Sequence, residues 1–283
     1  MNASWFKQIF TARWLSYLLI TVLFAISCVA LGMWQFARRD EARVEITRIL
    51  ENFDSTPVLV TDALPNLEAF NPDDRWTPVT MTGTYVTEDE ILVRGRPRDG
   101  APGFEVLTPL RLASGDTFIV DRGWLPTGES QDAPDHIPAA PEGEVTVVAR
   151  LKAGEPDIVG RGAIPGQVAT IELPLIAEML GYPTYTGAYG VMKSESPEPV
   201  EAPPAAVQRP QLDEGPHLSY AFQWILFAIM GFVGLGWAIR NEWRIRNADD
   251  PKEIARNEGL KAKKALRRPS DAEIEDELMD QSS

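Results

Sequence analysis

Cysteine and histidine are scarce in this sequence, whose 283 residues include one cysteine, Cys28, and two histidines. A single cysteine excludes an internal disulfide and a metal site built from paired thiols. Acidic residues are numerous, yet the chain contains neither a DxDxDG calcium loop nor an HExxH zinc motif. A disulfide framework and these metal-binding motifs are therefore excluded.

Charged residues are missing from two long segments. The segment Trp14–Phe36 runs for 23 residues without a charge, and Leu218–Ile239 runs for 22. At about 1.5 Å per residue, a helix of either length is roughly 33 Å long, which matches a hydrocarbon core of about 30 Å. A buried helix of a soluble protein rarely stays uncharged over this length. The sequence therefore predicts two transmembrane helices, over residues 14–36 and 217–239.

The first apolar segment differs from a secretory signal peptide. Its apolar region is too long, and no small-x-small cleavage site follows it. Cys28 follows Ala-Ile-Ser, as in a lipoprotein processing site, but it lies in the middle of the segment. We therefore expect an uncleaved anchor. Only 13 residues precede it, which leaves no room for an organelle transit peptide and favours a bacterial plasma membrane.

Two spans place both termini on one side of the membrane and the intervening domain on the other. Lysine and arginine near the span ends tend to mark the cytoplasmic side. The terminal side carries six such residues and the domain side five: Lys7, Arg13, Arg240, Arg244, Arg246 and Lys252 against Arg38, Arg39, Arg43, Arg48 and Arg209. This narrow excess predicts that the N-terminus, residues 1–13, and the charged tail, residues 240–283, are cytoplasmic.

The domain over residues 37–193 combines one helical segment with many short strands. After Phe36 the segment ARRDEARVEITRILENF alternates in charge sign and carries a partial apolar stripe, which predicts that the first helix continues into water. Runs rich in β-branched and aromatic residues then predict strands: WTPVTMTGTYV, EILVRGRP, FEVLTPLRL, DTFIVDRGWLP, EVTVVARLK, VATIELP and TGAYGVMK. The segment LPLIAEMLG predicts a short helix ended by Gly181. The expected fold is a membrane protein whose two transmembrane helices flank a mostly antiparallel β domain, a barrel or sandwich with minor helix.

The segment between this domain and the second span differs in composition. Residues 194–216 contain six prolines and almost no large apolar side chains. Such a composition predicts an extended linker that is not part of a core. The charged tail predicts a solvated helix or disorder, because blocks of charge with few apolar residues cannot bury a core.

The polar ends of the two spans meet at the same membrane depth, on the outer side. The first span ends in GMWQFARR and the second begins in HLSYAFQW, which supply Trp34, Gln35, Arg38 and Arg39, and His217, Tyr220, Gln223 and Trp224. A neutral imidazole can ligate haem iron, aromatic rings pack on a porphyrin, and arginines pair with propionates. If the spans touch, these residues form a pocket for a porphyrin at the outer leaflet, with His217 as the candidate iron ligand.

Each of these residues also has a plain explanation. The aromatic residues match the belt found at any membrane boundary, and the arginines can extend into water. His217 precedes the apolar run and can be a solvated flanking residue. Gln223 is harder to explain, because an amide at that depth needs a partner, which Gln35 or a bound ligand would supply.

Several motifs together resemble the surfeit locus protein 1 family of cytochrome c oxidase assembly factors. They are GMWQFARR, GTYV, ILVRGRP, PGFEVLTPL, VDRGWLP and HLSYAFQW, in the family's order, between about residues 14 and 240. The proline-rich linker and the long charged tail depart from the shorter members of the family. This departure leaves the local partners of these two segments open.

The resemblance implies a role in building the haem a-containing oxidase, by holding haem a transiently and delivering it to subunit I. The implied partners are subunit I, the haem a synthesis machinery and membrane lipid; no nucleic-acid partner is expected. The family's haem-associated histidine maps onto His217, followed by Tyr220, Gln223 and Trp224, and its first-span motif maps onto Trp34, Gln35 and Arg38. The Arg122-Gly123-Trp124 motif matches a turn whose expected role is structural, with glycine for the turn and tryptophan for the core.

Two other functions remain open. A scaffold or chaperone that grips an oxidase subunit without touching haem would use the small residues of the second span equally well. A membrane-anchored hydrolase would need a nucleophile and a base, but His136 lies in a loop, and neither Lys152 nor Lys193 has a serine nucleophile motif beside it. We therefore do not expect an enzyme.

Overall fold

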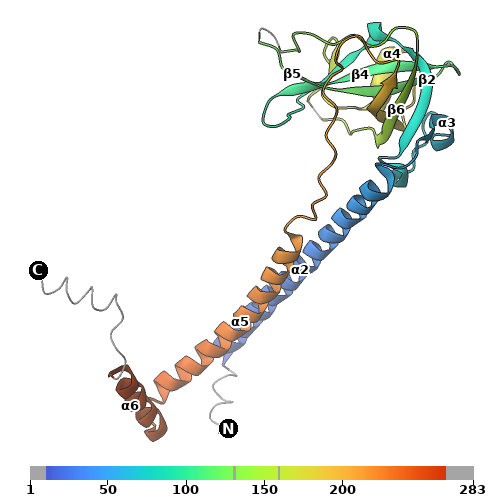
Figure 1. The fold of residues 1–283 in the computed structure, drawn as a ribbon. Helices are drawn as coiled ribbons and strands as arrows, with labels where there is room; N and C mark the ends of the chain where they lie inside the picture. The colour runs from blue at the N-terminus through green and yellow to red at the C-terminus, as the bar shows by residue number, and fades with distance from the viewer. Residues whose placement is uncertain (1–10, 130–131, 159, 266–283) are drawn as a thin grey trace, which may run out of the picture. The chain divides into compact units, whose positions relative to one another are not determined.

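The computed structural model describes residues 11–129, 132–158 and 160–265 (Figure 1). The chain divides into two compact units, with boundaries after Arg39 and after Glu214. One unit contains the apolar helices, and the other, residues 40–214, contains the strands. The first ten residues of the predicted N-terminal segment and residues 266–283 of the predicted tail lie outside the described part of the chain.

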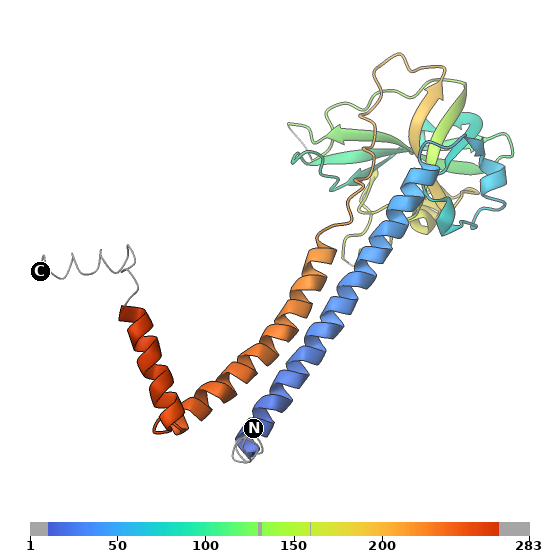
Figure 2. The same ribbon diagram turned by 60° about the horizontal axis from the view of Figure 1, so that its bottom comes forward.

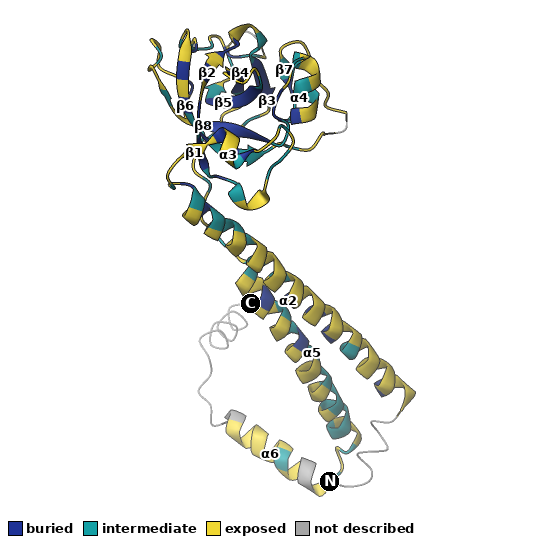
Figure 3. Ribbon diagram, turned by 90° about the vertical axis from the view of Figure 1, so that its right-hand side faces the viewer, coloured by how far each residue is buried: buried dark blue, intermediate teal, exposed yellow. Residues whose placement is uncertain are grey.

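The helical unit is built on helices α2 (Ala12–Asn52), α5 (His217–Arg246) and α6 (Pro251–Ala265), of which α2 continues past Arg39 into the strand unit. Helices α2 and α5 are long and apolar enough to cross a membrane, and an 18-residue stretch of each has a mean hydropathy of 2.3 and 1.8, respectively. Most of their side chains are exposed (Figure 3), as expected for helices that face lipid. The two predicted spans are therefore confirmed as helices. The predicted extension of the first helix beyond Phe36 is also confirmed.

Helices α2 and α5 lie side by side within the helical unit (Figures 1 and 2). The residues that are buried or partly buried along their contact recur every three or four positions: Thr21, Ala25, Cys28, Gly32 and Gln35 on α2, and His217, Ala221, Trp224, Ala228 and Gly231 on α5. This is the spacing of knobs-into-holes packing between two helices. A Cβ atom built on Gly32 would lie 3.5 Å from the carbonyl oxygen of Ala221, so small residues allow the backbones to approach closely.

The strand unit is a closed β barrel with short additional strands. Its strands are β1 (Val58–Leu59), β2 (Pro78–Tyr85), β3 (Ile91–Arg94), β4 (Gly103–Leu112), β5 (Thr117–Pro126), β6 (Glu144–Ala153), β7 (Gln167–Val168) and β8 (Ala188–Ser196). They follow the order β1-β2-β6-β8-β5-β4-β3-β7, and a pairing of β2 with β4 closes the barrel. The long ladders are antiparallel, whereas β5 and β8 are parallel and pair through only two residue pairs. The predicted barrel-like, mostly antiparallel fold is confirmed.

The remaining elements of the strand unit are short: α3 (Val60–Ala63), η1 (Pro72–Asp74), η2 (Thr87–Asp89) and α4 (Leu173–Leu180). Helix α4 ends at Gly181, whose φ of 72° is left-handed, as predicted.

The strand predicted at VATIELP is wrong beyond Val168. Its buried residues Val168 and Ile171 are three positions apart, and the Ile171 N–H donates to the Glu155 carboxylate at 3.1 Å instead of to a neighbouring strand.

The barrel interior is filled by alternate residues of each strand. In β6 the inward positions are Val145, Val147, Ala149 and Leu151, all of them buried, while their neighbours are more exposed (Figure 3). Residues from β2, β4, β5 and α3 pack against them in one apolar cluster. A second cluster joins β3 and β7 to α4. The alternation that predicts the strands also selects the side chains of the core.

The motif Arg122-Gly123-Trp124 lies within β5 rather than in a turn. The register of β4 and β5 shifts here, so that Val106 pairs with Gly123 and Leu107 with Asp121. The Arg122 side chain is fully buried and donates to the carbonyl oxygens of Pro138 and Ala139 at 3.0 and 3.2 Å. Trp124 is only half-buried, so its predicted place in the core is wrong. It donates Nε1–H to the Arg96 carbonyl oxygen instead.

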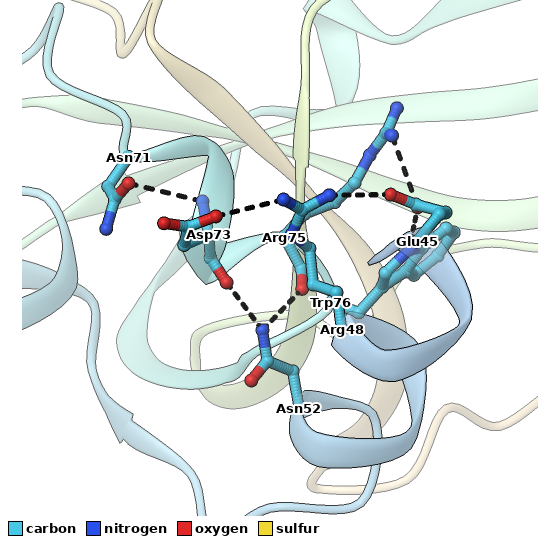
Figure 4. Close-up of polar contacts among 7 residues, drawn as sticks. All are labelled: Glu45, Arg48, Asn52, Asn71, Asp73, Arg75 and Trp76. Carbon is cyan, nitrogen blue, oxygen red and sulfur yellow. Dashed lines mark hydrogen bonds and ion pairs between the residues drawn. The ribbon is translucent and has the colours of Figure 1, made fainter. Parts of the chain in front are cut away.

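The last turns of α2 are anchored to the barrel by polar contacts (Figure 4). The Glu45 carboxylate accepts hydrogen bonds from Trp76 Nε1 at 3.1 Å and from Arg75 at 3.2 Å. The Asn52 amide donates to the carbonyl oxygens of Asp73 and Arg75. Burial tends to raise the pKa of Glu45, but these donors and Arg48 outweigh it and leave the pKa lowered.

An apolar cluster lies beside these contacts. Ile49 of α2 and Phe53, the first residue after α2, pack on Trp76, with the Phe53 and Trp76 ring centroids 5.9 Å apart. Trp76 has a φ of +71°, which is costly for a side chain of this size. The hydrogen bond to Glu45 and the packing of Phe53 hold it there. The apolar stripe predicted beyond the first span therefore serves to fix the end of α2 to the barrel.

The proline-rich segment is extended, as predicted, but it is bound to the barrel. Its first residues, Ser194–Ser196, belong to β8, and we call the following residues, 197–214, the strap. Ala205 and Trp124 exchange backbone hydrogen bonds of 2.8 and 2.9 Å, and Pro204 is buried. Arg98 also donates to the Ala206 carbonyl oxygen at 3.1 Å. The composition correctly indicates a segment without a core of its own, but backbone pairing makes it part of the domain.

Candidate functional site

Two of the predicted site residues, one from each span, meet directly. Gln35 Oε1 on α2 lies 2.8 Å from His217 Nδ1 on α5, although the residues are 182 positions apart. Gln35 is in the last part of the apolar run, and His217 is the first residue of α5. Both side chains are half-buried. The packing of the two spans therefore creates the imidazole–amide pair.

This hydrogen bond determines which nitrogen of the imidazole carries the proton. An amide oxygen only accepts hydrogen bonds, so His217 Nδ1 must be the donor. In the neutral imidazole the lone pair then lies on Nε2. Histidines that bind metals are commonly held in this way, with one ring nitrogen donating to an oxygen and the other facing the metal.

The chain just before α5 leaves room beside this nitrogen. Gly215 has a φ of +69°, and a Cβ atom built there would lie 3.4 Å from His217 Cδ2 and Nε2. Any side chain at this position would therefore contact the edge of the ring that carries the lone pair. Glycine satisfies the backbone conformation and also keeps the side of Nε2 clear.

Aromatic rings line the contact between α2 and α5 next to the Gln35–His217 pair. Trp224 is half-buried, lies one helical turn beyond Ala221 and packs edge-on against Phe227, with ring centroids 5.8 Å apart. Both rings adjoin the buried cluster of Ala25, Cys28 and Ala228. Trp224 is therefore the predicted aromatic residue that the structure places closest to the contact between the spans.

The other predicted residues lie on the flanks or away from the contact. Trp34 and Tyr220 are 55% and 46% exposed. Arg38 is exposed and Arg39 half-buried, and both lie within about one helical turn of Gln35. This end of the helix pair therefore combines an imidazole, an amide, aromatic surface and two cations.

Gln223 lies on the opposite face of α5. Two residues past the buried Ala221, it is rotated by roughly 200° around the helix, and its side chain is exposed. Gln35 therefore binds His217 instead of the amide that the sequence suggested as its partner. The sequence does not predict the rotation of each helix, which decides that Gln35 faces α5 while Gln223 faces away from α2.

Sequence reasoning did not identify Gly215 or the contact of Phe36 with Phe222. The two phenylalanine rings meet edge-on with centroids 6.4 Å apart, beside the imidazole–amide pair. The Gly-Pro-His order before the second span was the available signal for Gly215, since a glycine two residues before a candidate ligand often permits close approach.

The features expected of a hydrolase are not assembled in the described part of the barrel. Lys152 Nζ lies over the rings of Trp76 and Tyr189, at 5.7 and 5.4 Å, and Lys193 is exposed. His136 Nε2 lies 2.7 Å from the Glu201 carboxylate at the surface. Among the described residues, no group of three or more His, Cys, Asp or Glu side chains is arranged to hold a metal ion. The helix pair is therefore the better candidate site.

Comparison with known proteins places these motifs in one family. The model of the SURF1 family matches residues 22–229, which include part of each span and the whole barrel. A SURF1-like protein of Mycobacterium tuberculosis is 32% identical over 241 residues, 83% of this chain and 87% of that protein. The SURF1-like protein of Dictyostelium discoideum is 25% identical over 107 residues, 36% of this chain and 40% of that protein.

A further relative carries a functional name. The cytochrome oxidase assembly protein SHY1 of Saccharomyces cerevisiae is 26% identical over 147 residues, which cover 48% of this chain and 36% of that protein. The family match spans well over half of the chain and includes both Gln35 and His217. The chain, in which two apolar helices precede and follow a β barrel in the sequence, belongs to the SURF1 family.

Proposed function

We propose that this protein acts in the assembly of cytochrome oxidase. Membership of the SURF1 family and the similarity to the yeast assembly protein support this role. The proposed partners are therefore components of the oxidase.

More specifically, we propose that the paired ends of α2 and α5 hold haem a and deliver it to subunit I. The single observation that carries this proposal is the hydrogen bond between Gln35 and His217. It leaves Nε2 of a neutral imidazole with a lone pair, next to the gap kept by Gly215. Haem, if bound here, would supply an iron that an imidazole nitrogen can ligate, and His217 is the residue that would hold it.

The neighbouring residues have distinct roles in this proposal. Gln35 is a positioning residue, because it acts through His217. Trp224, with Trp34 and Tyr220 on the flanks, offers aromatic surface to the macrocycle. Arg38 and Arg39 supply positive charge for the propionates. Gln223 has no role, because it lies on the other face of α5.

We also propose a bacterial plasma membrane as the location, with both termini in the cytoplasm and the barrel outside. The slight excess of basic residues on the terminal side supports this orientation. It places the Gln35–His217 pair at the outer leaflet, at the depth where the polar part of a haem can reach water. The haem a synthesis machinery would supply the cofactor from the same membrane.

The test is the haem content of the full-length protein, purified in detergent from cells that make haem a. We expect a haem absorbance in the wild type that is lost in His217→Ala. His136→Ala is the matched control, because it removes the other histidine from an exposed loop, and it should keep its haem. Colourless wild-type protein that still restores oxidase assembly would instead favour a scaffold that never touches haem.

The role of Gln35 is tested by the same measurement. Removing the partner of a ligating histidine commonly weakens metal binding by about 10- to 100-fold. We expect Gln35→Leu to lose haem in that range and to shift the absorbance of what remains, whereas Gln223→Leu should behave like wild type. Equal losses in both variants would show that Gln35 has no special relation to His217.

A further inference from the structure

The barrel has a weak seam between β5 and β8. These strands pair only at Val120 with Gly190 and at Asp121 with Val191, and then they diverge. Beyond this point β8 continues to Ser196, bonded on one side to β6. Among the described residues, no strand pairs with its other side from Met192 to Ser196. This stretch of β8 is therefore an open strand edge.

The strap lies over the place where β5 and β8 diverge, but it does not form a strand between them. It returns along β5 and exchanges backbone hydrogen bonds with Trp124 at Ala205 alone. Four of the eight residues before Ala205 are prolines, which have no N–H to donate to a strand edge: Pro197, Pro199, Pro203 and Pro204. The sequence of the strap thus prevents it from filling the edge of β8 itself.

A groove of about 610 Å³ remains between the strap and β8. Its β8 wall is formed by residues 192–195 and its strap wall by residues 198–206. Met192 and the prolines and alanines of the strap give it an apolar lining, and Val200 is fully exposed beside it. At about 3.3 Å per residue, the open edge matches a strand of four or five residues.

The floor of the groove contains a buried acceptor. The Glu195 side chain is 3% exposed, and its Oε2 accepts the Tyr85 hydroxyl at 2.9 Å. Its Oε1 is buried without a hydrogen-bond partner, and the nearest cation, the Arg122 guanidinium, is 4.0 Å away. Glu195 therefore places a carboxylate beneath the β8 wall of the groove, where it contributes negative charge but not an accessible acceptor.

The charge of the groove favours a basic ligand. Three glutamates line it, Glu195, Glu198 and Glu201, against the single cation Lys193. The strand unit as a whole carries 30 acidic and 13 basic residues. An extended segment with lysine or arginine beside small apolar residues would therefore match both the charge and the lining of the groove.

We propose that this groove binds a basic, extended peptide segment of a partner protein, which adds as a short strand along Met192–Ser196 of β8. The strap itself already binds the barrel by backbone pairing, since Ala205 pairs with β5. Backbone hydrogen bonds to the β8 edge supply the affinity, and the glutamates select for positive charge. This docking surface lies on the barrel and is independent of the haem site.

The test uses the full-length protein in detergent and a fluorescent peptide, Lys-Val-Lys-Val-Lys, with binding followed by fluorescence polarisation. We expect it to bind at least 10-fold more tightly than Glu-Val-Glu-Val-Glu and than the same lysine peptide with methylated backbone nitrogens. Ala202→Trp fills the groove from the strap side and should weaken binding at least 10-fold. Its control, Ala113→Trp, places the same side chain in an exposed turn and should change nothing.

Two results would overturn the proposal. One is equal binding of the lysine, glutamate and methylated peptides, or no binding by any of them. The other is binding that Ala202→Trp leaves unchanged. A second variant, Glu195→Gln, should weaken the lysine peptide selectively; because Glu195 also accepts from Tyr85, its folding is compared with wild type by circular dichroism.

Discussion

At the scale of single residues, the barrel contains a carboxyl group that burial changes strongly. Asp121 of β5 is fully buried, and its Oδ1 accepts the Gly123 N–H at 3.0 Å. Burial, together with the negative charge of Glu105, raises the pKa of Asp121 to about 8. The hydrogen bond from Gly123 and the charges of Lys152 and Arg96 oppose this shift but do not cancel it.

This raised pKa makes a prediction about stability. In the unfolded chain Asp121 loses its proton near pH 4, whereas the folded chain keeps it until about pH 8. The contribution of Asp121 to the free energy of unfolding therefore falls as the pH rises from about 4 to about 8. Asp121→Asn removes the titration and can keep the hydrogen bond from Gly123. We expect the difference in melting temperature, variant minus wild type, to be larger at pH 8.5 than at pH 5.

The measurement is thermal unfolding of both full-length proteins in detergent, followed by circular dichroism at the two pH values. All other titrating groups are common to both proteins, so the difference isolates Asp121. A difference between variant and wild type that is the same at both pH values would contradict the assignment.

At the scale of elements, the strap depends on one glycine of β5. A Cβ atom built on Gly123 would lie 2.7 Å from the Ala205 carbonyl oxygen and 2.9 Å from that of Pro204. These are backbone atoms that cannot move aside without displacing the strap. We expect Gly123→Ala to detach the strap, to lower stability by about 1–3 kcal/mol, and to expose the Glu201–Ala202 bond of the strap to a glutamyl endopeptidase. Limited proteolysis with mass spectrometry follows the cleavage.

Gly115 provides the control for this prediction. It also has a positive φ, +91°, but a Cβ atom there would meet nothing within 4 Å. Gly115→Ala therefore carries the cost of the backbone conformation without the clash. If both variants are cleaved after Glu201 at the same rate, the contact with the strap is not what requires glycine at position 123.

The elements differ in how far the sequence predicts them. The long strands and α4 follow from alternation and from Gly181, because their side chains alternate between core and surface. The strap could not be predicted as part of the domain, since its binding uses the backbone of Ala205 and Trp124, which leaves no trace in composition. The strand expected at VATIELP failed because Ile171 is held by the Glu155 side chain.

At the scale of the whole molecule, the sequence predicts which span ends carry the candidate site but not which of its residues pair. The two apolar runs place Gln35, His217 and Gln223 near one end of the spans. Which of them meet depends on the rotation of each helix, and that is set by the small residues along the contact, such as Gly32 and Ala221. The pairing of Gln35 with His217 therefore appears only when the two helices are packed.

The most direct test of this account is a disulfide between the spans. A Cβ atom built on Gly32 would lie 3.8 Å from the Trp224 Cβ, which matches the mean Cβ separation of about 3.8 Å in disulfides. In full-length protein with Cys28→Ala, the account predicts that Gly32→Cys with Trp224→Cys forms an internal disulfide on oxidation in membranes. Gly32→Cys with Gln223→Cys should form little, because position 223 faces away. Equal cross-linking of the two pairs, or none at 32–224, would contradict the packing that brings Gln35 to His217.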